Sequence, residues 1–290
     1  MTGAAPPLER TAPHDRYADY CLWDYRPLSP AAGKLRGANL LWQSMEAAGG
    51  MPRLAAACRA LRDALGPGQT VFGVKNFGGR LRFEFYFYDY ARLQRAVSIT
   101  RVRAILAPLV RCALPPLEGR PYFMFSIDLD EEIVAGERPL DTINIYIGNP
   151  GSSVSSGICY EQSASGLRLA NLYYFFDARR EMDDVAAKVG CSVHHDLGGY
   201  PLNAVLRPEL LDCAVIVVAN KRFGDGVYFS RIPVAGLIGF VEQERFPSDL
   251  VAFVRDHRDD LDHLLYDVGI DYVVEAGMVR VTKSAFYGLL

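Results

Sequence analysis

Several features that mark other protein classes are missing from this sequence. Lys and Arg total 31 against 34 Asp and Glu, a net charge of −3, so it has no basic excess of the kind that neutralises nucleic-acid phosphates. The longest purely apolar run, residues 213–219, is far shorter than the roughly 20 residues of a membrane span. Residues 1–16 lack the apolar region of a secretory signal. We therefore expect a soluble, cytoplasmic protein with neither a nucleic-acid nor a membrane partner.

Paired cysteines are missing as well. The chain has six cysteines, and no two of them form a CxxC pair. In a chain of this size, scattered cysteines are typical of small buried apolar side chains rather than of a disulfide framework or a zinc site. They are Cys21, Cys58, Cys112, Cys159, Cys191 and Cys213.

What the chain does have is enough apolar material for a large core. It is 290 residues long and 50% hydrophobic, which excludes intrinsic disorder. Pro and Gly punctuate residues 1–39, which we interpret as an irregular arm with a short helix near residues 15–25. Residues 40–290 are interpreted as a single domain. It begins with helices at 40–48 and at 52–65, the second of which starts at a Pro and is followed by a Gly.

Beyond residue 65 the pattern predicts five pairs of strands. The pairs are 70–74 with 80–90, 122–129 with 142–147, 158–162 with 167–176, 213–220 with 227–233, and 270–275 with 279–286. Helices are predicted at 93–112, with an interruption near Pro108, at 181–189 and at 247–266, and residues 148–157 are interpreted as a Gly/Ser linker. Glycine-containing turns join the two strands of most pairs, with residues 223–226 as the turn of the fourth, so the pairing is antiparallel.

Alternation along these strands separates an apolar face from a polar one. Phe83, Phe85 and Phe87 fall on one face, whereas Glu84 and Tyr86 fall on the other. An ordinary half-exposed sheet would show the same pattern. The abundance of Tyr on the polar face and the small number of predicted helices favour closure into a ten-stranded antiparallel β-barrel with helices outside. The expected class is α+β, and the polar face would then line a solvent-filled lumen.

A lumen lined by Tyr and basic residues suits one chemistry. Guanidinium and ammonium groups can clamp a diphosphate, Tyr ring faces can stabilise a carbocation, and a neighbouring carboxylate can orient an acceptor or take its proton. Glu84, which lies between Arg82 and Tyr86 on the polar face, is the candidate for that last role.

Four segments resemble the ABBA aromatic prenyltransferases. FSIDLDEEIVAGERPLDTINIYIG (125–148) is similar to the second hairpin of the cyanobactin-type peptide prenyltransferases, and MVRVTKSAFYG (278–288) to their last strand. RLRFEFYFYD (80–89) resembles their first hairpin. ANLYYFF (170–176) resembles a strand of relatives that prenylate small phenols. The resemblance spans residues 71–290 and implies the same barrel fold.

Carried over to this sequence, the resemblance implies a diphosphate site and an aromatic shield. The diphosphate contacts would be Arg82, Arg231 and Arg280. Lys283 is the alternative to Arg280, and alternation favours Arg280 because Val279 and Val281 then face the helices. The shield and lumen positions are Tyr86, Tyr146, Tyr173, Asn144 and Asn171. The second hairpin departs from the family, which has a basic residue where this chain has Thr142, Asn144 and Tyr146.

The implied reaction moves an isoprenyl group from dimethylallyl or geranyl diphosphate to an electron-rich side chain of a ribosomally made peptide. The short linker at 148–157 favours such an acceptor by opening the barrel mouth. A small aromatic metabolite is the alternative acceptor, and a non-catalytic barrel that binds a hydrophobic ligand is the alternative function. Mg²⁺ is the expected cofactor, with Asp128 the inward-facing member of an acidic stretch that could contact it.

Overall fold

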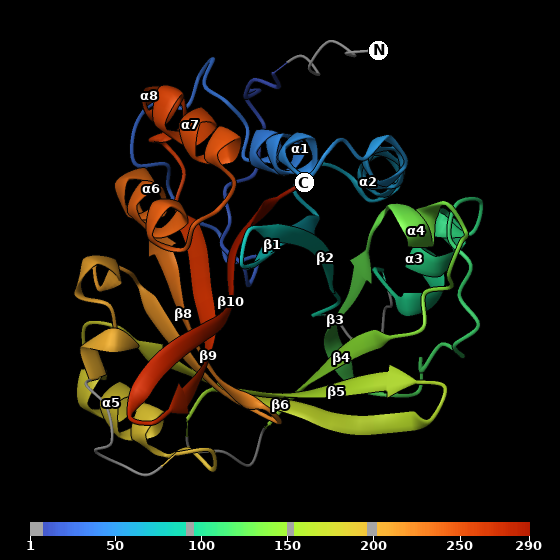
Figure 1. Ribbon diagram of the computed structural model, residues 1–290. Helices are drawn as coiled ribbons and strands as arrows, with labels where there is room; N and C mark the ends of the chain where they lie inside the picture. Colours follow the sequence, from blue (N-terminus) through green and yellow to red (C-terminus); the bar gives the residue numbers. More distant parts are fainter. Residues whose placement is uncertain (1–7, 91–95, 150–153, 196–201) are drawn as a thin grey trace.

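The chain folds into a closed barrel of ten antiparallel strands with helices on its outer surface (Figure 1). The computed structural model describes residues 8–90, 96–149, 154–195 and 202–290. Neighbouring strands follow the order β1-β10-β9-β8-β7-β6-β5-β4-β3-β2, and β1 and β10 close the ring through pairs that run from Val71↔Leu289 to Asn76↔Ser284. The predicted architecture is therefore confirmed.

The strands correspond closely to the five predicted pairs. They are β1 (Thr70–Phe77), β2 (Arg80–Tyr88), β3 (Tyr122–Leu129), β4 (Ile143–Gly148), β5 (Ser156–Ser163), β6 (Gly166–Asp177), β7 (Val215–Lys221), β8 (Gly224–Ile232), β9 (Tyr266–Glu275) and β10 (Met278–Leu289). The helices are α1 (Ala38–Ala47), α2 (Pro52–Leu65), α3 (Ile99–Leu106), α4 (Glu131–Val134), α5 (Met182–Gly190), α6 (Val234–Gln243), α7 (Ser248–Asp256) and α8 (Arg258–Leu261).

Local sequence accounts for the start and end of several elements. α2 begins at Pro52 and is followed by Gly66 at φ 100°, as predicted. The Ser98 side chain caps α3 by accepting a hydrogen bond from the Arg101 backbone N–H. Gly78 and Gly79 both have positive φ in the two-residue turn between β1 and β2, a conformation that favours Gly and matches the twist of a hairpin.

Three predicted elements differ from the structure in their positions. The helix predicted at 93–112 is helical only at α3, and residues 93–95 lie outside the described part. The helix predicted at 247–266 is two helices, α7 and α8, and β9 already begins at Tyr266. α6 was not predicted, because Gly236 and Gly239 weaken its helical signal. Within the linker predicted at 148–157, Gly148 ends β4, Ser156 begins β5, and 150–153 lie outside the described part.

The turn predicted at 223–226 is also shifted, because Gly224 and Gly226 belong to β8. A Cβ on Gly224 would lie 2.6 Å from the Tyr272 carbonyl oxygen, and one on Gly226 would lie 2.8 Å from Asp271 Oδ1. These glycines therefore allow β9 and its side chains to approach closely and do not make the turn.

The main hydrophobic core lies between the outer face of the barrel and the helices. Phe83, Phe85 and Phe87 point into it and are fully buried, whereas Glu84, Tyr86 and Tyr88 point into the lumen. The alternation seen in the sequence therefore assigned both faces of β2 correctly. Among the described residues, no helix is both long enough and apolar enough to cross a membrane.

The N-terminal arm does not form the short helix predicted near residues 15–25. A bridge joins Ala18 to Asp24, and Leu22 lies between them at φ 57°. This tight loop carries Tyr20 into one end of the barrel, where the Tyr20 backbone N–H donates to Asp267 Oδ2 at 2.8 Å. The loop forms because contacts with the barrel outweigh the local preference of the segment.

Of the six cysteines, Cys58, Cys159 and Cys213 are buried, as expected. Cys191 is exposed, and Cys21 and Cys112 are intermediate, so the expectation of burial is wrong for Cys191. All six are free thiols.

Candidate functional site

The barrel encloses a cavity of about 170 Å³ whose wall changes character along its length. Three zones follow one another along the cavity. Strand β9 passes through all three, and its residues Asp271, Gly269 and Asp267 point inward, one in each zone. Asp271 lies among lysines, Gly269 lies beneath a tyrosine ring, and Asp267 meets the N-terminal arm. We call these zones the lysine end, the tyrosine girdle and the arm end.

The lysine end consists of three lysines from three strands. Lys75 lies on β1, Lys221 on β7 and Lys283 on β10, and each lines the cavity. Asp271 bridges two of them, since both carboxylate oxygens lie 2.7 Å from Lys221 Nζ and Oδ2 lies 2.7 Å from Lys283 Nζ. Burial alone would raise the pKa of Asp271, but the two lysines hold it far below its usual value.

Lys221 shares its carboxylate partner, Asp271, with Lys283. Its Nζ donates to the Tyr228 hydroxyl at 2.6 Å, and that hydroxyl in turn donates to Asp271 at 2.8 Å. Burial lowers the pKa of Lys221 to about 8; Asp271 opposes the shift, and the charges of Lys283 and Lys75 add to it. The lysine end is therefore a place where an additional anion would be stabilising.

Glu84 lies beside Lys75, and both of its carboxylate oxygens are occupied. Oε2 accepts from the Tyr86 hydroxyl and forms an ion pair with Lys75 Nζ, both at 2.6 Å. Oε1 accepts from Ser126 at 2.5 Å and from Asn144 at 3.4 Å. Burial alone would raise the pKa of Glu84, but the charge of Lys75 and these hydrogen bonds lower it to about 2. Glu84 is therefore an anion that holds its neighbours in place.

The tyrosine girdle is a ring of aromatic side chains around the middle of the lumen. Its members are Tyr86, Tyr146, Tyr173, Tyr228 and Tyr287. The ring centroids of the pairs Tyr86–Tyr287, Tyr146–Tyr173, Tyr173–Tyr228 and Tyr228–Tyr287 are 5.9–6.4 Å apart. Burial raises the pKa of each of these phenols well above its usual value. The girdle is consequently neutral, and its rings can face a cationic centre without supplying a phenolate that would capture it.

Glycine makes room for the girdle at two places. A Cβ on Gly269 would lie 2.1 Å from the Tyr228 ring, and one on Gly73 would lie 2.9 Å from the Tyr287 ring. The absence of a side chain on β1 and β9 therefore allows both rings to lie flat against the barrel wall.

The arm end is closed by Tyr20 and its neighbours. The Tyr20 ring contacts those of Tyr86 and Tyr287 edge to face, at centroid distances of 5.0 Å and 4.7 Å. The Tyr88 hydroxyl donates to the Tyr20 carbonyl oxygen, and Arg231 Nε donates to Asp19 at 2.8 Å. Burial raises the pKa of Asp267 to about 7, with the charge of Asp19 adding to the shift.

Seven of the residues selected from the sequence meet in this lumen. They are Glu84, Lys283, Tyr86, Tyr146, Tyr173, Asn144 and Asn171. Their proximity confirms the predicted orientation of the strands. Their chemical roles remain predictions.

The three selected arginines lie outside the lumen lining. Arg82 is exposed beyond the lysine end, with its guanidinium carbon 5.3 Å from the Phe77 ring centroid. The Arg231 side chain reaches toward the arm, and its backbone has a φ of 67°. Arg280 has a 58% exposed side chain paired with Glu275 at 2.6 Å.

Strand alternation predicted that Arg280, and not Lys283, faces the lumen. This prediction was wrong, because Lys283 lines the lumen and Arg280 does not. Val281 pairs with Tyr272 and Lys283 with Asp271, so Thr282 is an extra residue in a β-bulge. The bulge shifts the alternation by one position, so Lys283, Ala285 and Tyr287 point inward. An uninterrupted period of two cannot reveal such a shift.

Several residues that line the lumen were not predicted from the sequence to lie there. They include Tyr20, Lys75, Lys221, Tyr228, Asp267, Asp271 and Tyr287. The alternation of Phe72 and Val74 with Gly73 and Lys75 was a signal for Lys75. Tyr20 had no comparable signal, because it belongs to an irregular segment.

Asp128 faces the lysine end, as predicted, and bonds Lys75 Nζ at 2.7 Å. Its side chain is 52% exposed. Within the described ranges, no group of three His, Cys, Asp or Glu side chains could hold a metal ion on its own. A magnesium ion here would need oxygen atoms from a bound ligand.

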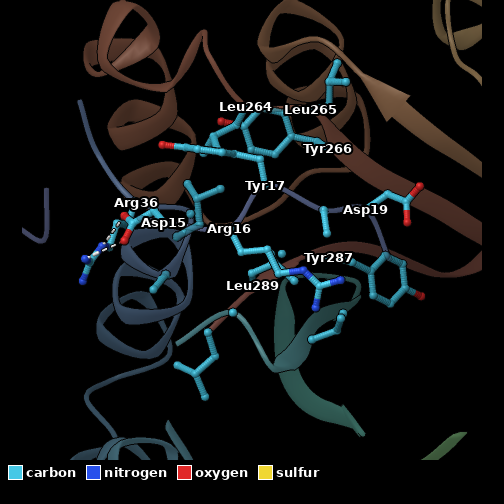
Figure 2. Close-up of a pocket in the computed structure, with 18 of the residues that line it drawn as sticks. Asp15, Arg16, Tyr17, Asp19, Arg36, Leu264, Leu265, Tyr266, Tyr287 and Leu289 are labelled. Carbon is cyan, nitrogen blue, oxygen red and sulfur yellow. Dashed lines mark hydrogen bonds and ion pairs between the residues drawn. The ribbon is translucent and has the colours of Figure 1, made fainter. Parts of the chain in front are cut away.

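A second, smaller cavity of about 80 Å³ lies behind the arm (Figure 2). Arg16, Tyr17 and Asp19 of the arm line it, together with residues near the C-terminus such as Leu289. Asp19, Tyr20 and Asp267 border both cavities. The arm therefore separates the lumen from this second space.

The chain is similar in structure to solved proteins. A 6-dimethylallyl tryptophan synthase matches 88% of this chain and 96% of its own chain, with a TM-score of 0.48 and 11% sequence identity. No protein-family model and no curated protein matches the sequence.

Proposed function

We propose that this protein transfers an isoprenyl group from an allylic diphosphate to an aromatic acceptor. The observation that carries the proposal is the order of zones in the lumen, where a lysine cluster leads into a girdle of neutral tyrosines. The cations match a diphosphate, and the adjoining aromatic walls match the prenyl chain and the carbocation that forms when the diphosphate leaves. The sequence resemblance to ABBA prenyltransferases supports the same assignment.

In this mechanism the lysine end holds the leaving group. Lys75, Lys221 and Lys283 would donate to the diphosphate oxygens and stabilise the negative charge that develops as the allylic C–O bond breaks. A bound diphosphate would also raise the pKa of Lys221, because it adds a second anion beside a lysine that shares Asp271 with Lys283. Glu84 would position Lys75 and the Tyr86 hydroxyl. Arg82 would attract the donor to the mouth without holding it.

A magnesium ion could bind at this site only together with the diphosphate group of the donor. Asp128 would supply one carboxylate oxygen and the diphosphate the others, an arrangement that Mg²⁺ accepts. The metal would neutralise part of the charge on the leaving group. Calorimetric titration with dimethylallyl thiolodiphosphate, a non-hydrolysable analogue of the donor, with and without Mg²⁺ tests this part of the proposal.

We propose that the acceptor is an aromatic side chain of a peptide. A small aromatic molecule is the alternative acceptor. A peptide would place only one side chain in the lumen, whereas a small phenol would enter it whole. Incubation with dimethylallyl diphosphate and either a Tyr- and Trp-containing peptide or naphthol distinguishes them. Mass spectrometry would show which acceptor gains a prenyl group.

The donor site is tested by calorimetric titration with the thiolodiphosphates of dimethylallyl and geranyl alcohols. We expect saturable binding to the wild type, and a dissociation constant at least tenfold higher for Lys283→Met, equivalent to about 1.4 kcal/mol. Arg280→Ala is the matched control on the same strand, and its dissociation constant should stay within about twofold of the wild type, because a paired surface charge contributes little. Failure of the wild type to bind either analogue would contradict the donor site and favour a non-catalytic ligand-binding barrel.

A further inference from the structure

Asp267 is a buried carboxylate at the arm end with one oxygen left unpaired. It is 6% exposed and lines the lumen. Oδ2 accepts the backbone N–H of Tyr20 at 2.8 Å, whereas Oδ1 has no hydrogen-bond partner among the described residues. Buried polar atoms without a partner are rare in proteins and call for an explanation.

The neighbouring carboxylate, Asp19, has structural partners on both oxygens. Asp19 Oδ1 accepts the backbone N–H groups of Cys21 and Trp23 at 3.0 Å, and its Oδ2 accepts from Arg231 at 2.8 Å. Asp19 is thereby fully bonded and holds the arm against β8. The arm needs no second carboxylate for this, so the unpaired oxygen of Asp267 is not explained by the need to fix the arm.

The position of Asp267 suits a ligand on the far side of the girdle from the lysines. Asp267 and Asp271 are four residues apart on β9, about 13 Å along a strand at 3.3 Å per residue. The Tyr228 ring lies between them, because it covers Gly269, whereas Tyr287 pairs with Asp267 and lies beside it. A donor held at the lysine end would therefore present its prenyl group toward Asp267.

Glu84, the carboxylate first selected from the sequence, is poorly placed to take a proton. Its two oxygens already receive hydrogen bonds from Ser126, Tyr86 and Asn144 and an ion pair from Lys75. Protonation of Glu84 would break the ion pair and leave the buried Lys75 without one of its negatively charged partners. Oδ1 of Asp267 forms no ion pair among the described residues, and burial outweighs the lowering of its pKa by the nearby Ser230 hydroxyl and Arg231 backbone N–H.

We propose that Asp267 is the residue that accepts the proton released by the aromatic acceptor. This inference rests on the proposed function. The allylic C–O bond breaks and its electron pair leaves with the diphosphate. An electron pair of the acceptor then forms the new bond to the prenyl carbon, and the proton on the attacking atom passes to Oδ1 of Asp267. The acceptor is therefore a protic aromatic molecule or side chain bound between the girdle and the arm.

The ionisation of Asp267 agrees with this role. Its pKa of about 7, raised by burial and by Asp19, lies in the range where a carboxylate both exists at neutral pH and accepts protons effectively. Tyr20 also faces it from the arm. The other titratable or charged groups around it are Asp19, Cys21 and Tyr25 of the arm, Arg231 of β8, Tyr287 of β10 and Cys213 before β7.

A distinctive pH profile follows from the two ends of the lumen. Transfer should increase as pH rises through about 7, because Asp267 becomes the carboxylate that can accept a proton. In kcat/KM for the donor, which reports the free enzyme, it should fall above about 8, because Lys221 loses the charge that attracts the diphosphate. The resulting profile is bell-shaped, with the ascending limb assigned to Asp267 and the descending limb to Lys221.

The test compares Asp267→Asn with the wild type, using dimethylallyl diphosphate as donor and naphthol or the Tyr- and Trp-containing peptide as acceptor. We expect transfer to fall on the order of 10²-fold and the ascending limb to disappear. Binding of the thiolodiphosphate should stay within about twofold. Diphosphate release should continue with water in place of the acceptor, so that the product changes from prenylated acceptor to prenyl alcohol.

Two further variants keep the test decisive. Asp267→Glu retains a carboxylate and should recover part of the transfer activity and the ascending limb, even if Asp267→Asn folds poorly. Glu84→Gln should retain the ascending limb whatever its overall rate. Wild-type transfer and pH profile in Asp267→Asn would overturn the role of Asp267 alone. Equal loss of donor binding and transfer in both Asp267 variants would overturn it in favour of a structural role. A wild type that neither binds the analogue nor releases diphosphate would overturn the proposed function and this inference together.

Discussion

At the scale of single residues, burial makes each lumen charge dependent on its partner. Lys75 Nζ lies 2.6 Å from Glu84 and 2.7 Å from Asp128, and Glu84 is 4% exposed. Removing water from both ions carries a large cost that their attraction offsets, so loss of one partner leaves the other uncompensated. The pair therefore constrains the geometry of the lysine end whether or not a ligand is bound.

We predict that Glu84→Gln lowers the free energy of unfolding by about 3 kcal/mol at pH 7. In the wild type, Glu84 has a pKa of about 2 instead of its usual 4.5. Its contribution to stability should therefore be complete above pH 4.5 and be lost as pH falls toward 2. Urea denaturation across this range measures both effects. Glu275→Gln, which removes the exposed partner of Arg280, is the control and should have little effect. Equal losses in the two variants would contradict the prediction.

At the scale of elements, the shape of the lumen depends on departures from regular strands. The bulge at Thr282 turns Lys283 inward, and Gly269 allows the Tyr228 ring to lie against β9. Tyr228 in turn bonds both Lys221 and Asp271. One backbone position therefore supports the girdle and the lysine end together.

We predict that Gly269→Ala destabilises the protein by about 2 kcal/mol, because the new methyl group overlaps the Tyr228 ring. Displacement of Tyr228 should also weaken binding of the dimethylallyl thiolodiphosphate. Gly239→Ala on α6 is the matched control, since a Cβ there meets nothing within 4 Å, and it should be neutral or slightly stabilising. Urea unfolding and calorimetry check both outcomes. Unchanged stability in Gly269→Ala would show that the ring can move without cost.

At the scale of the whole molecule, the first and last segments of the chain complete the site. Pairing of β1 with β10 closes the barrel, and the arm places Tyr20 across one end of the lumen. The length of the lumen is therefore limited by a residue outside the ten strands.

We predict that Tyr20→Ala lengthens the lumen and shifts donor preference toward the geranyl analogue by at least threefold, about 0.6 kcal/mol. The ratio of the two thiolodiphosphate dissociation constants measures the change. Tyr17→Ala is the arm control, because the Tyr17 ring packs against Tyr25 and His263 and lines only the second cavity. A similar shift in both variants would mean that the arm as a whole, and not the Tyr20 ring, sets the preference.

Much of the barrel could be predicted, because alternation along the strands and glycine turns are patterns of residues that are close together in the sequence. Alternation placed Phe83, Phe85 and Phe87 outside and Glu84 and Tyr86 inside, and Gly78-Gly79 marked a hairpin turn. These signals depend on neighbours in sequence, where a period of two and a positive φ are readable. The prediction went wrong at Lys283, because a bulge resets the period without an obvious residue signature.

By itself, the sequence determined the strand pairs, their antiparallel arrangement and the inward face of most strands, since burial and turn chemistry are local properties of the chain. Only the tertiary structure decided which charges meet. The lysine end draws Lys75, Lys221 and Lys283 from strands far apart in the chain, and the arm end unites Tyr20 with Asp267 across 247 positions. Such contacts, and the pKa values that they shift, depend on how the ring of strands closes and on what lies across its end, and no periodicity along the chain encodes either.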